Sequence, residues 1–465
     1  MAVASWPARL GGRGLGGRSR RGIHAALADH RRYERQIDRL HQRHLFDGGL
    51  QRLTDTGISL ATVVMHRGEV ARLLARTVDA GDYQLRPATI RAILIDGRRR
   101  MVFDYPLLDL IVHGVVADVL AEAVEPLLSS SVYSYRAGTS WLDGVSSLAR
   151  YMRAHRRARP DPRTRGVYVL RRDVDSYTDS IPLGARSPLW TQLERAIAGL
   201  GSPPPTAADR QLISDVVRPT VATDGDPPAT RLRGVATGQP ISCVCFNLFL
   251  SEVDLELGSI PSAFYGRYSD DLVFAHPDAD VARAASETLD RRLAALGLQL
   301  NAEKRHDLYL TGAGRSSEAW PAARGTTNVP FLGMRVTLDG VVALGHHKTR
   351  GLLRDARRRA GNAARALRDF DIDRRGHAVA GALNTLLDPD DHHLHGSAAP
   401  LLAGVVTDRR QLQQLDHLLA RTVSSAVSGV RGPAAFRKLS YRRVRGELGL
   451  RSLRRTRDSG GRVRR

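Results

Sequence analysis

Residues 264–275 read FYGRYSDDLVFA, in which two adjacent carboxylates stand between apolar segments. The pattern predicts a strand, an acidic turn at Asp270 and Asp271, and a second strand. Neighbouring carboxylates repel each other, so such a turn is costly unless positive charge lies beside it. A pair of divalent cations is the natural source of that charge, and a solvated acidic turn is the alternative.

A third carboxylate at another strand end would complete such a site. Asp173 follows the apolar run Val167–Leu170, which predicts a short strand, and Asp175 comes two residues later. Three carboxylates can hold two cations about 3.5–4 Å apart, one activating a 3′-hydroxyl and the other stabilising the leaving pyrophosphate. Asp173, Asp270 and Asp271 therefore predict phosphoryl-transfer chemistry.

The composition points to a polyanionic partner. Of the 465 residues 42% are hydrophobic, enough for a sizeable core, and the formal net charge is +22. Nearly all basic residues are arginine, since only Lys304, Lys348 and Lys438 are lysine. No apolar run reaches the roughly 18 residues that span a bilayer. We therefore expect nucleic acid rather than a membrane as the partner, and a cytoplasmic location.

Apolar periodicity predicts helices in residues 26–80 and 105–128. Between them, Ile93–Ile95, the turn Asp96-Gly97 and Arg98–Phe103 predict a hairpin with a basic arm. Residues before about 25 are rich in Arg and Gly and predict a disordered arm.

Further elements follow along the chain. Residues 201–230 are rich in Pro, Thr and Asp and are expected to include a flexible insertion. A helix is expected to start at Gly238-Gln239-Pro240, with Pro at its first position, and another to run from Asp280 as N-cap to Gly297. Residues 331–337 predict one strand, and the chain reads as helical after about residue 345.

An ordered series of segments resembles the motifs of the reverse transcriptase family. The segments are SYRAG (134–138), RDVDSYTDSIPL (172–183), GVATGQPIS (234–242) with Asn247, YSDD (268–271), LGLQLNAEK (296–304) and FLG (331–333). The resemblance implies an α/β right-hand polymerase, with a palm built from an antiparallel sheet and helices. Its fingers and palm would occupy residues 26–345, after a basic arm in 1–25, and a helical Arg-rich thumb with a basic tail would occupy 346–465.

The resemblance also implies a role for each motif residue. Asp173, Asp270 and Asp271, with the backbone of Val174, would bind two Mg²⁺ or Mn²⁺ ions, and Lys304 would protonate the leaving pyrophosphate. The incoming nucleotide would contact Arg98, Arg99, Arg100, Tyr177, Thr178, Gly238, Gln239 and Pro240. The implied substrates are an RNA template, a DNA or RNA primer and dNTPs. The thumb would grip the duplex through Arg350, Arg354, Arg357, Arg358 and Arg359.

The sequence departs from the common family pattern at two places. Thr178 stands where a large aromatic residue usually screens out the ribose 2′-hydroxyl, and strand alternation would point Tyr177 to the opposite face. Ala236-Thr237 replaces the usual Pro-Gln. Both departures separate the chain from the intron-encoded and retroviral branches, although its general look is that of bacterial group II intron, retron, defence and diversity-generating enzymes. Antiphage defence, with an associated non-coding RNA, is the preferred setting.

Two alternative functions remain open at this point. Thr178 favours a ribonucleotide-tolerant or template-independent polymerase, and the basic surface favours an RNA-binding intron maturase. Two other clusters have plainer interpretations. The acidic and histidine-rich stretch 388–395 reads as a solvated loop, and Cys243 and Cys245 read as core residues in a reducing compartment.

Overall fold

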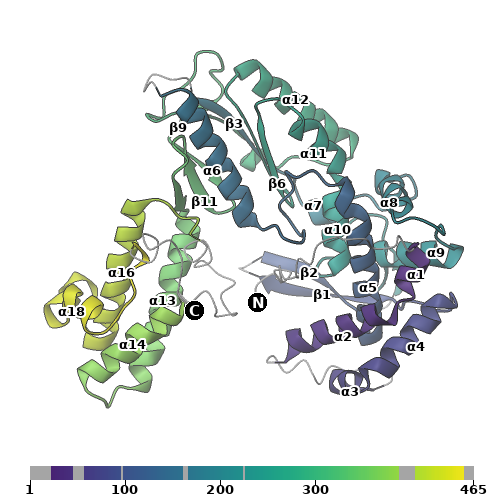
Figure 1. The fold of residues 1–465 in the computed structure, drawn as a ribbon, viewed down its shortest axis with the longest axis horizontal. Helices are drawn as coiled ribbons and strands as arrows, with labels where there is room; N and C mark the ends of the chain where they lie inside the picture. Colours follow the sequence, from purple (N-terminus) through teal and green to yellow (C-terminus); the bar gives the residue numbers. More distant parts are fainter. Residues whose placement is uncertain are drawn as a thin grey trace. The chain divides into compact units, whose positions relative to one another are not determined.

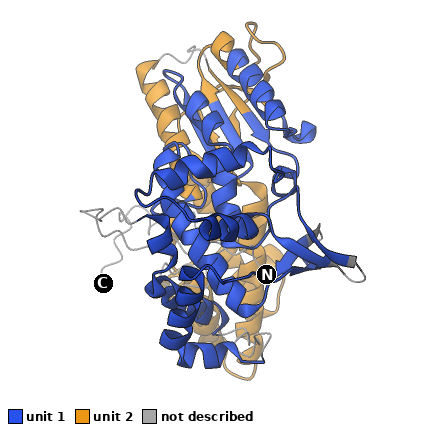
Figure 2. Ribbon diagram, turned by 90° about the vertical axis from the view of Figure 1, so that its right-hand side faces the viewer, with its two compact units in different colours: residues 1–140, 171–274, 283–305 blue, residues 141–170, 275–282, 306–465 orange. Residues whose placement is uncertain are grey.

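The computed structural model describes residues 22–45, 57–95, 98–160, 166–223, 226–386 and 404–454. The chain divides into two units (Figure 2). Unit 1 comprises Met1–Ser140, Arg171–Phe274 and Arg283–Arg305, and unit 2 comprises Trp141–Leu170, Ala275–Ala282 and His306–Arg465. Helices and largely antiparallel sheets are both present (Figure 1), so the predicted α/β class is confirmed.

Unit 1 opens with helices, as the periodicity predicted. They are α1 (Ile23–Leu27), α2 (His30–His44), α3 (Leu60–Met65), α4 (Arg67–Asp79) and α5 (Leu107–Val124), followed by the 3₁₀ turn η2 (Glu125–Leu127). The centre of α5 is buried on nearly every side because α2, α8 and α10 pack against it. Helix α1 begins inside the range assigned to a disordered arm, and Ile23 and Leu27 are buried.

The predicted hairpin is confirmed. Strands β1 (Ala88–Ile95) and β2 (Arg98–Asp104) pair antiparallel from Thr89↔Asp104 to Ile95↔Arg98. They belong to a sheet of order β2-β1-β4-β5, completed by β4 (Thr220–Thr223) and β5 (Asp226–Thr230).

The structure places a helix and two strands within 201–230, the range expected to include a flexible insertion. Helix α9 (Ala207–Val217) occupies much of that range, and β4 and β5 follow it. Thr206 and Asp209 form a capping box at the start of α9, each side chain accepting a backbone N–H of the other. Leu212, Ile213 and Val216 are buried along one face of the helix. The Pro, Thr and Asp content of this range favoured a loop, although the sequence also contained the capping box and the apolar face of a helix.

Further helices of unit 1 precede the acidic hairpin in the chain. They are α7 (Tyr177–Ser180), α8 (Pro188–Ala198), α10 (Pro240–Phe249) and α11 (Ser251–Gly258). Helix α10 begins with Pro240 at its first position, as predicted. Strands β6 (Phe264–Tyr268) and β7 (Asp271–His276) flank the acidic turn, which confirms the predicted strand–turn–strand pattern. The 3₁₀ turn η3 (Ala302–Lys304) closes the last segment of this unit.

A five-stranded sheet has the order β6-β7-β3-β8-β9. Its other members are β3 (Val167–Asp173), β8 (His306–Leu310) and β9 (Arg324–Thr326). Helix α12 (Ala279–Ala295) follows β7. The carboxylate of Asp278, rather than the predicted Asp280, accepts the backbone N–H groups of Asp280 and Val281 at its start, at 2.8 and 3.2 Å.

Unit 2 contains α6 (Trp141–Ala158) and a small sheet of β10 (Asn328–Phe331), β11 (Met334–Thr337) and β12 (Val342–Leu344). The single strand predicted for 331–337 is wrong. Leu332 and Gly333 have φ of 50° and 76°, so they form a two-residue turn between β10 and β11. An apolar residue at positive φ gave no sign of that turn.

The end of unit 2 is helical, as predicted. Helices α13 (His346–Ala366), α14 (Ile372–Leu386) and α16 (Arg409–Ser428) pack against one another (Figure 1). The 3₁₀ turn η4 (Gly432–Ala434), α17 (Ala435–Lys438) and α18 (Tyr441–Gly446) follow. The stretch 388–395 lies outside the described residues. Among the helices that are described, none is long and apolar enough to cross a membrane.

Candidate catalytic site

The acidic turn is joined to the end of β3 by the backbone. Ser269, at the tip between β6 and β7, has a φ of 56°, which lets the chain reverse before Asp270. The Val174 N–H donates to the Asp270 carbonyl oxygen at 3.1 Å. Asp173, Asp270 and Asp271 therefore belong to two strand ends of unit 1 that a hydrogen bond holds together.

Lys304 lies on the Asp173 carboxylate. Its Nζ is 2.8 Å from both carboxylate oxygens, and the Asp173 carbonyl oxygen accepts the Asn301 N–H at 2.9 Å. The Asn301 side chain in turn accepts the Glu303 N–H, which starts the η3 turn that carries Lys304. The two motifs that supplied Asp173 and Lys304, about 130 residues apart in the chain, thus meet in one place.

Asp271 forms an ion pair with Arg171. Arg171 Nη2 lies 3.1 and 3.2 Å from the two oxygens of Asp271. Burial still raises the pKa of Asp271 to about 6; Arg171 opposes that rise, and Asp270 and Asp173 add to it. Burial, with the nearby Asp173 carboxylate, also raises the pKa of Asp270. The cluster holds more negative charge than its protein cations offset.

This donor set fits a hard divalent cation. Mg²⁺ and Mn²⁺ prefer carboxylate oxygens, and half-buried carboxylates with raised pKa values gain most from a bound cation. In the described part of the chain no group of three or more His, Cys, Asp or Glu residues is arranged as a metal-binding cluster. In this structure Lys304 and Arg171 contact oxygens of Asp173 and Asp271.

The segment after Asp173 does not continue as a strand. Ser176 has a φ of 46°, and Tyr177 starts the short helix α7, so the alternation expected for Tyr177 and Thr178 is wrong. The Tyr177 ring is buried against Phe246, and its hydroxyl donates to the Phe246 carbonyl oxygen at 2.8 Å. Thr178 is only partly buried. Tyr177 therefore serves the core, and Thr178 remains the side chain nearer the surface.

The residues expected to contact the incoming nucleotide lie in different structural environments. Gly238 has a φ of 90° and leads into α10, which Pro240 begins. Gln239 is buried, and its amide donates to the Phe103 carbonyl oxygen of β2 at 3.3 Å. Gln239 thus ties the start of α10 to the hairpin. The backbone of residues 98–100 lies in β2, and their side chains fall outside what is described.

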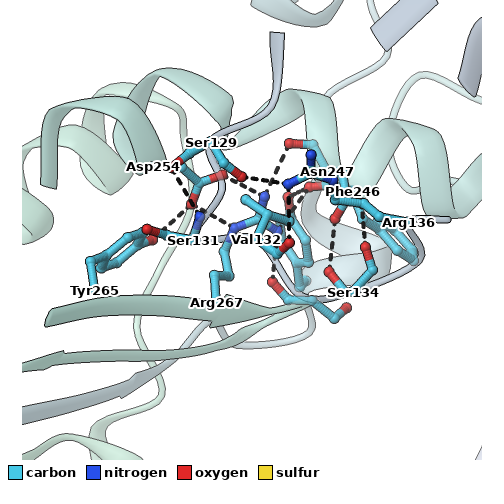
Figure 3. Close-up of polar contacts among 12 residues, drawn as sticks. Ser129, Ser131, Val132, Ser134, Arg136, Phe246, Asn247, Asp254, Tyr265 and Arg267 are labelled. Carbon is cyan, nitrogen blue, oxygen red and sulfur yellow. Dashed lines mark hydrogen bonds and ion pairs between the residues drawn. The ribbon is translucent and has the colours of Figure 1, made fainter. Parts of the chain in front are cut away.

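Sequence reasoning assigned no role to Arg171 or Arg267. Arg171 pairs with Asp271, and Arg267 is fully buried in β6 with Asp254 as its partner (Figure 3). A charged residue inside an apolar strand is the signal that could have drawn attention to them, because a buried charge needs a partner. The partner's identity had no comparable signal, since Asp254 lies on a separate helix.

Solved structures with some similarity include telomerases. A truncated apo telomerase from Candida tropicalis is 14% identical with a TM-score of 0.40, covering 56% of each chain. The telomerase from Candida albicans with a TWJ fragment of telomeric RNA is 13% identical with a TM-score of 0.45, covering 82% of this chain and 66% of its own. The chain thus spans about 56–66% of the length of these two.

No curated protein matches the chain. In contrast, the sequence profile described as reverse transcriptase (RNA-dependent DNA polymerase) matches residues 97–336, which is 240 of the 465 residues. The matched range contains Asp173, Asp270, Asp271 and Lys304. The chain therefore belongs to the reverse transcriptase family, and its α/β architecture is the right-hand polymerase fold that its motifs predicted.

Proposed function

We propose that this chain is an RNA-directed DNA polymerase, a nucleotidyltransferase that extends a DNA or RNA primer along an RNA template. One observation carries the proposal. Three carboxylates from two ordered motifs, with Lys304 of a third motif on Asp173, are held at two strand ends joined by the hydrogen bond from Val174 to Asp270. In a solvated acidic turn the carboxylates would be exposed, whereas burial raises the pKa values of Asp270 and Asp271 here.

The site residues divide the chemistry among them. Asp173, Asp270 and Asp271, with the Val174 carbonyl, would hold two Mg²⁺ or Mn²⁺ ions. Bound there, the ions would supply activation of the primer hydroxyl and stabilisation of the pyrophosphate charge. Lys304 donates from Nζ to Asp173, and its side chain is 47% exposed, so its ammonium would be the proton donor to the leaving group.

The basic face of α13 supports duplex binding by a thumb at 346–465. His347, Arg350, Arg354 and Arg357 line a hollow along α13, spaced so that they share one face of the helix. The three arginines of this row suit a sugar–phosphate backbone without regard to base sequence. Arg358 and Arg359 differ, since Arg358 lies 3.6 Å from Asp355 and Arg359 donates to Thr385 of α14.

A ribonucleotide-tolerant activity is a second candidate. The position of Tyr177 favours it, because this side chain points into the core and donates a hydrogen bond to the Phe246 carbonyl oxygen. Tyr177 therefore does not supply the bulky aromatic group that Thr178 lacks for screening the ribose 2′-hydroxyl. We further propose that the chain is a cytoplasmic enzyme of bacterial antiphage defence that works with a non-coding RNA.

Primer extension on an RNA template tests the metal site. Asp270→Asn removes one cation ligand and should lower Mg²⁺- or Mn²⁺-dependent dNTP incorporation by orders of magnitude, while RNA binding and folding persist. Asp175→Asn is the matched control, because Asp175 is an exposed carboxylate two residues after Asp173. Near-normal incorporation by the Asp270→Asn protein would show that the carboxylates do not hold the catalytic ions.

A further inference from the structure

Arg267 is an arginine with no exposed surface whose N–H groups all have acceptors (Figure 3). Nε donates to Asp254 Oδ1 at 2.7 Å, and Nη2 donates to Asp254 Oδ2 at 2.6 Å and to the Asn247 carbonyl oxygen at 3.1 Å. Nη1 donates to the carbonyl oxygens of Ser269 at 3.1 Å and Phe246 at 3.4 Å. Every donor of the planar fork is therefore used.

One of these acceptors belongs to the acidic turn. Ser269 directly precedes Asp270, and its φ of 56° is a conformation that residues other than glycine seldom adopt. The guanidinium holds the Ser269 carbonyl oxygen, so it fixes the peptide plane that leads into Asp270. The orientation of Asp270 thus depends on a side chain two strand positions before the tip.

The other acceptors come from helices α10 and α11. Phe246 and Asn247 offer carbonyl groups from the last turn of α10, which have no partner within the helix. The Asn247 amide donates to the Ser134 carbonyl oxygen at 2.6 Å and accepts from the Ser134 hydroxyl at 2.8 Å. Asp254 anchors the fork from α11, and Tyr265 donates to the same carboxylate at 2.8 Å.

The backbone of Arg267 is bound to the segment before α6 as well. Its N–H donates to the Ser131 carbonyl oxygen and its own carbonyl oxygen accepts the Tyr133 N–H, both at 2.9 Å. One residue therefore connects α10, α11 and residues 131–134 to the acidic turn. A side chain that only balanced the charge of Asp254 would not need to reach Ser269.

We propose that Arg267 is a positioning residue for the catalytic cations: it sets the Asp270–Asp271 turn in its cation-binding orientation without touching substrate. The inference rests on the proposed function, in which these carboxylates bind the ions. The inference predicts that the affinity for divalent cations depends on the hydrogen bond from Arg267 to Ser269, and that this dependence is separate from the stability of the fold.

Arg267→Lys is the informative change. A lysine ammonium keeps the charge near Asp254, but as a compact group it cannot also bridge to Ser269 and the α10 carbonyls. Mn²⁺ binding to the full chain, followed by the electron paramagnetic resonance signal of free Mn²⁺, reports on the turn without catalysis. We expect the half-saturating Mn²⁺ concentration to rise about 10- to 100-fold, as for other residues that orient metal ligands. In primer extension kcat should fall while the KM for dNTP stays unchanged.

Two further variants separate positioning from stability. Tyr265→Phe removes a hydrogen bond to the same Asp254 without touching the turn, so it should lower the melting temperature and leave Mn²⁺ binding unchanged. Ser269→Gly in the Arg267→Lys background should recover part of the affinity, because glycine adopts positive φ freely. A purely structural role would give no such recovery.

The outcomes are distinct. If Arg267→Lys melts earlier but binds Mn²⁺ like the unaltered chain, the inference is overturned and the proposed function stands. Should Arg267→Lys not fold, Asp254→Glu keeps the carboxylate charge and displaces the anchor of the fork by one methylene group, and unchanged Mn²⁺ affinity in that variant would equally overturn the inference. If the Asp270→Asn protein binds Mn²⁺ as tightly as the unaltered chain does, the carboxylates are not the metal ligands. The proposed metal site and the inference about Arg267 are then both wrong.

Discussion

Replacing Asp254 with alanine should destabilise the protein more than any exposed charge deletion. Asp254 and Arg267 both have side chains of 0% exposure, and the carboxylate accepts three hydrogen bonds of 2.6–2.8 Å from Arg267 and Tyr265. Removing one partner of a buried ion pair leaves the other charge uncompensated, at a cost of about 3–5 kcal/mol. That is a large share of a typical folding free energy of about 5–15 kcal/mol.

The chain offers a matched control on the same helix. Glu252 also pairs with an arginine, Arg195, at 3.4 Å, but their side chains are 58% and 60% exposed. Exposed pairs of this kind contribute only about 0–1 kcal/mol. Urea unfolding followed by circular dichroism should therefore separate Asp254→Ala clearly from Glu252→Ala. Equal stabilities for the two variants would refute the idea that the Asp254–Arg267 pair is held in a desolvated site.

Three other predictions address the nucleotide, the duplex and the N-terminal helix. Thr178→Phe should sharpen the preference for dNTPs over NTPs in single-nucleotide incorporation, and strong rejection of NTPs by the unaltered chain would place the sugar gate elsewhere. Arg354→Ala should weaken duplex binding for all sequences and reduce the log–log salt slope by about 1, whereas Arg368→Ala, beyond the α13 hollow, should change neither. The pKa of His24 is raised by its hydrogen bond to Asp209 and by Asp79, so its stabilising effect is complete below the unfolded value of 6.5 and is lost as pH rises through the folded value. The loss of stability in His24→Gln should therefore be greater at about pH 6 than at about pH 8.5, and a pH-independent loss would contradict the ion pairs.

Local signals explain what the sequence could predict. The acidic hairpin, the β1–β2 hairpin and the start of α10 each depend on a few consecutive residues: Asp270-Asp271 between apolar strands, Asp96-Gly97 between alternating runs, and Pro240 at a helix start. The ordered motifs then indicated which strand ends belong together. The contact between Lys304 and Asp173 agrees with that order, although no local pattern contained it.

The failures have two physical causes. Backbone conformations that composition does not reveal account for Tyr177 and for residues 331–337, where Ser176 and Leu332 adopt positive φ without being glycine. Long-range partners account for the buried network, because nothing near Arg267 in the sequence indicates Asp254 on α11 or the carbonyl groups at the end of α10. Burial of a charge could be suspected from the strand around it, but its acceptors come from tertiary packing alone.

The scarcity of lysine has a practical consequence for optical work on this enzyme. Its three lysines occupy three different surroundings: Lys304 is 47% exposed but has its ammonium paired with Asp173, Lys348 lies with its ammonium 4.1 Å from the Trp141 ring centre, and Lys438 at the end of α17 is exposed. An amine-selective dye in limiting amount therefore meets Lys438 most readily among the side chains. A fluorophore attached there would report on the helical region of unit 2 while leaving the catalytic carboxylates unmodified. The arginine-rich composition therefore makes selective labelling at a lysine possible.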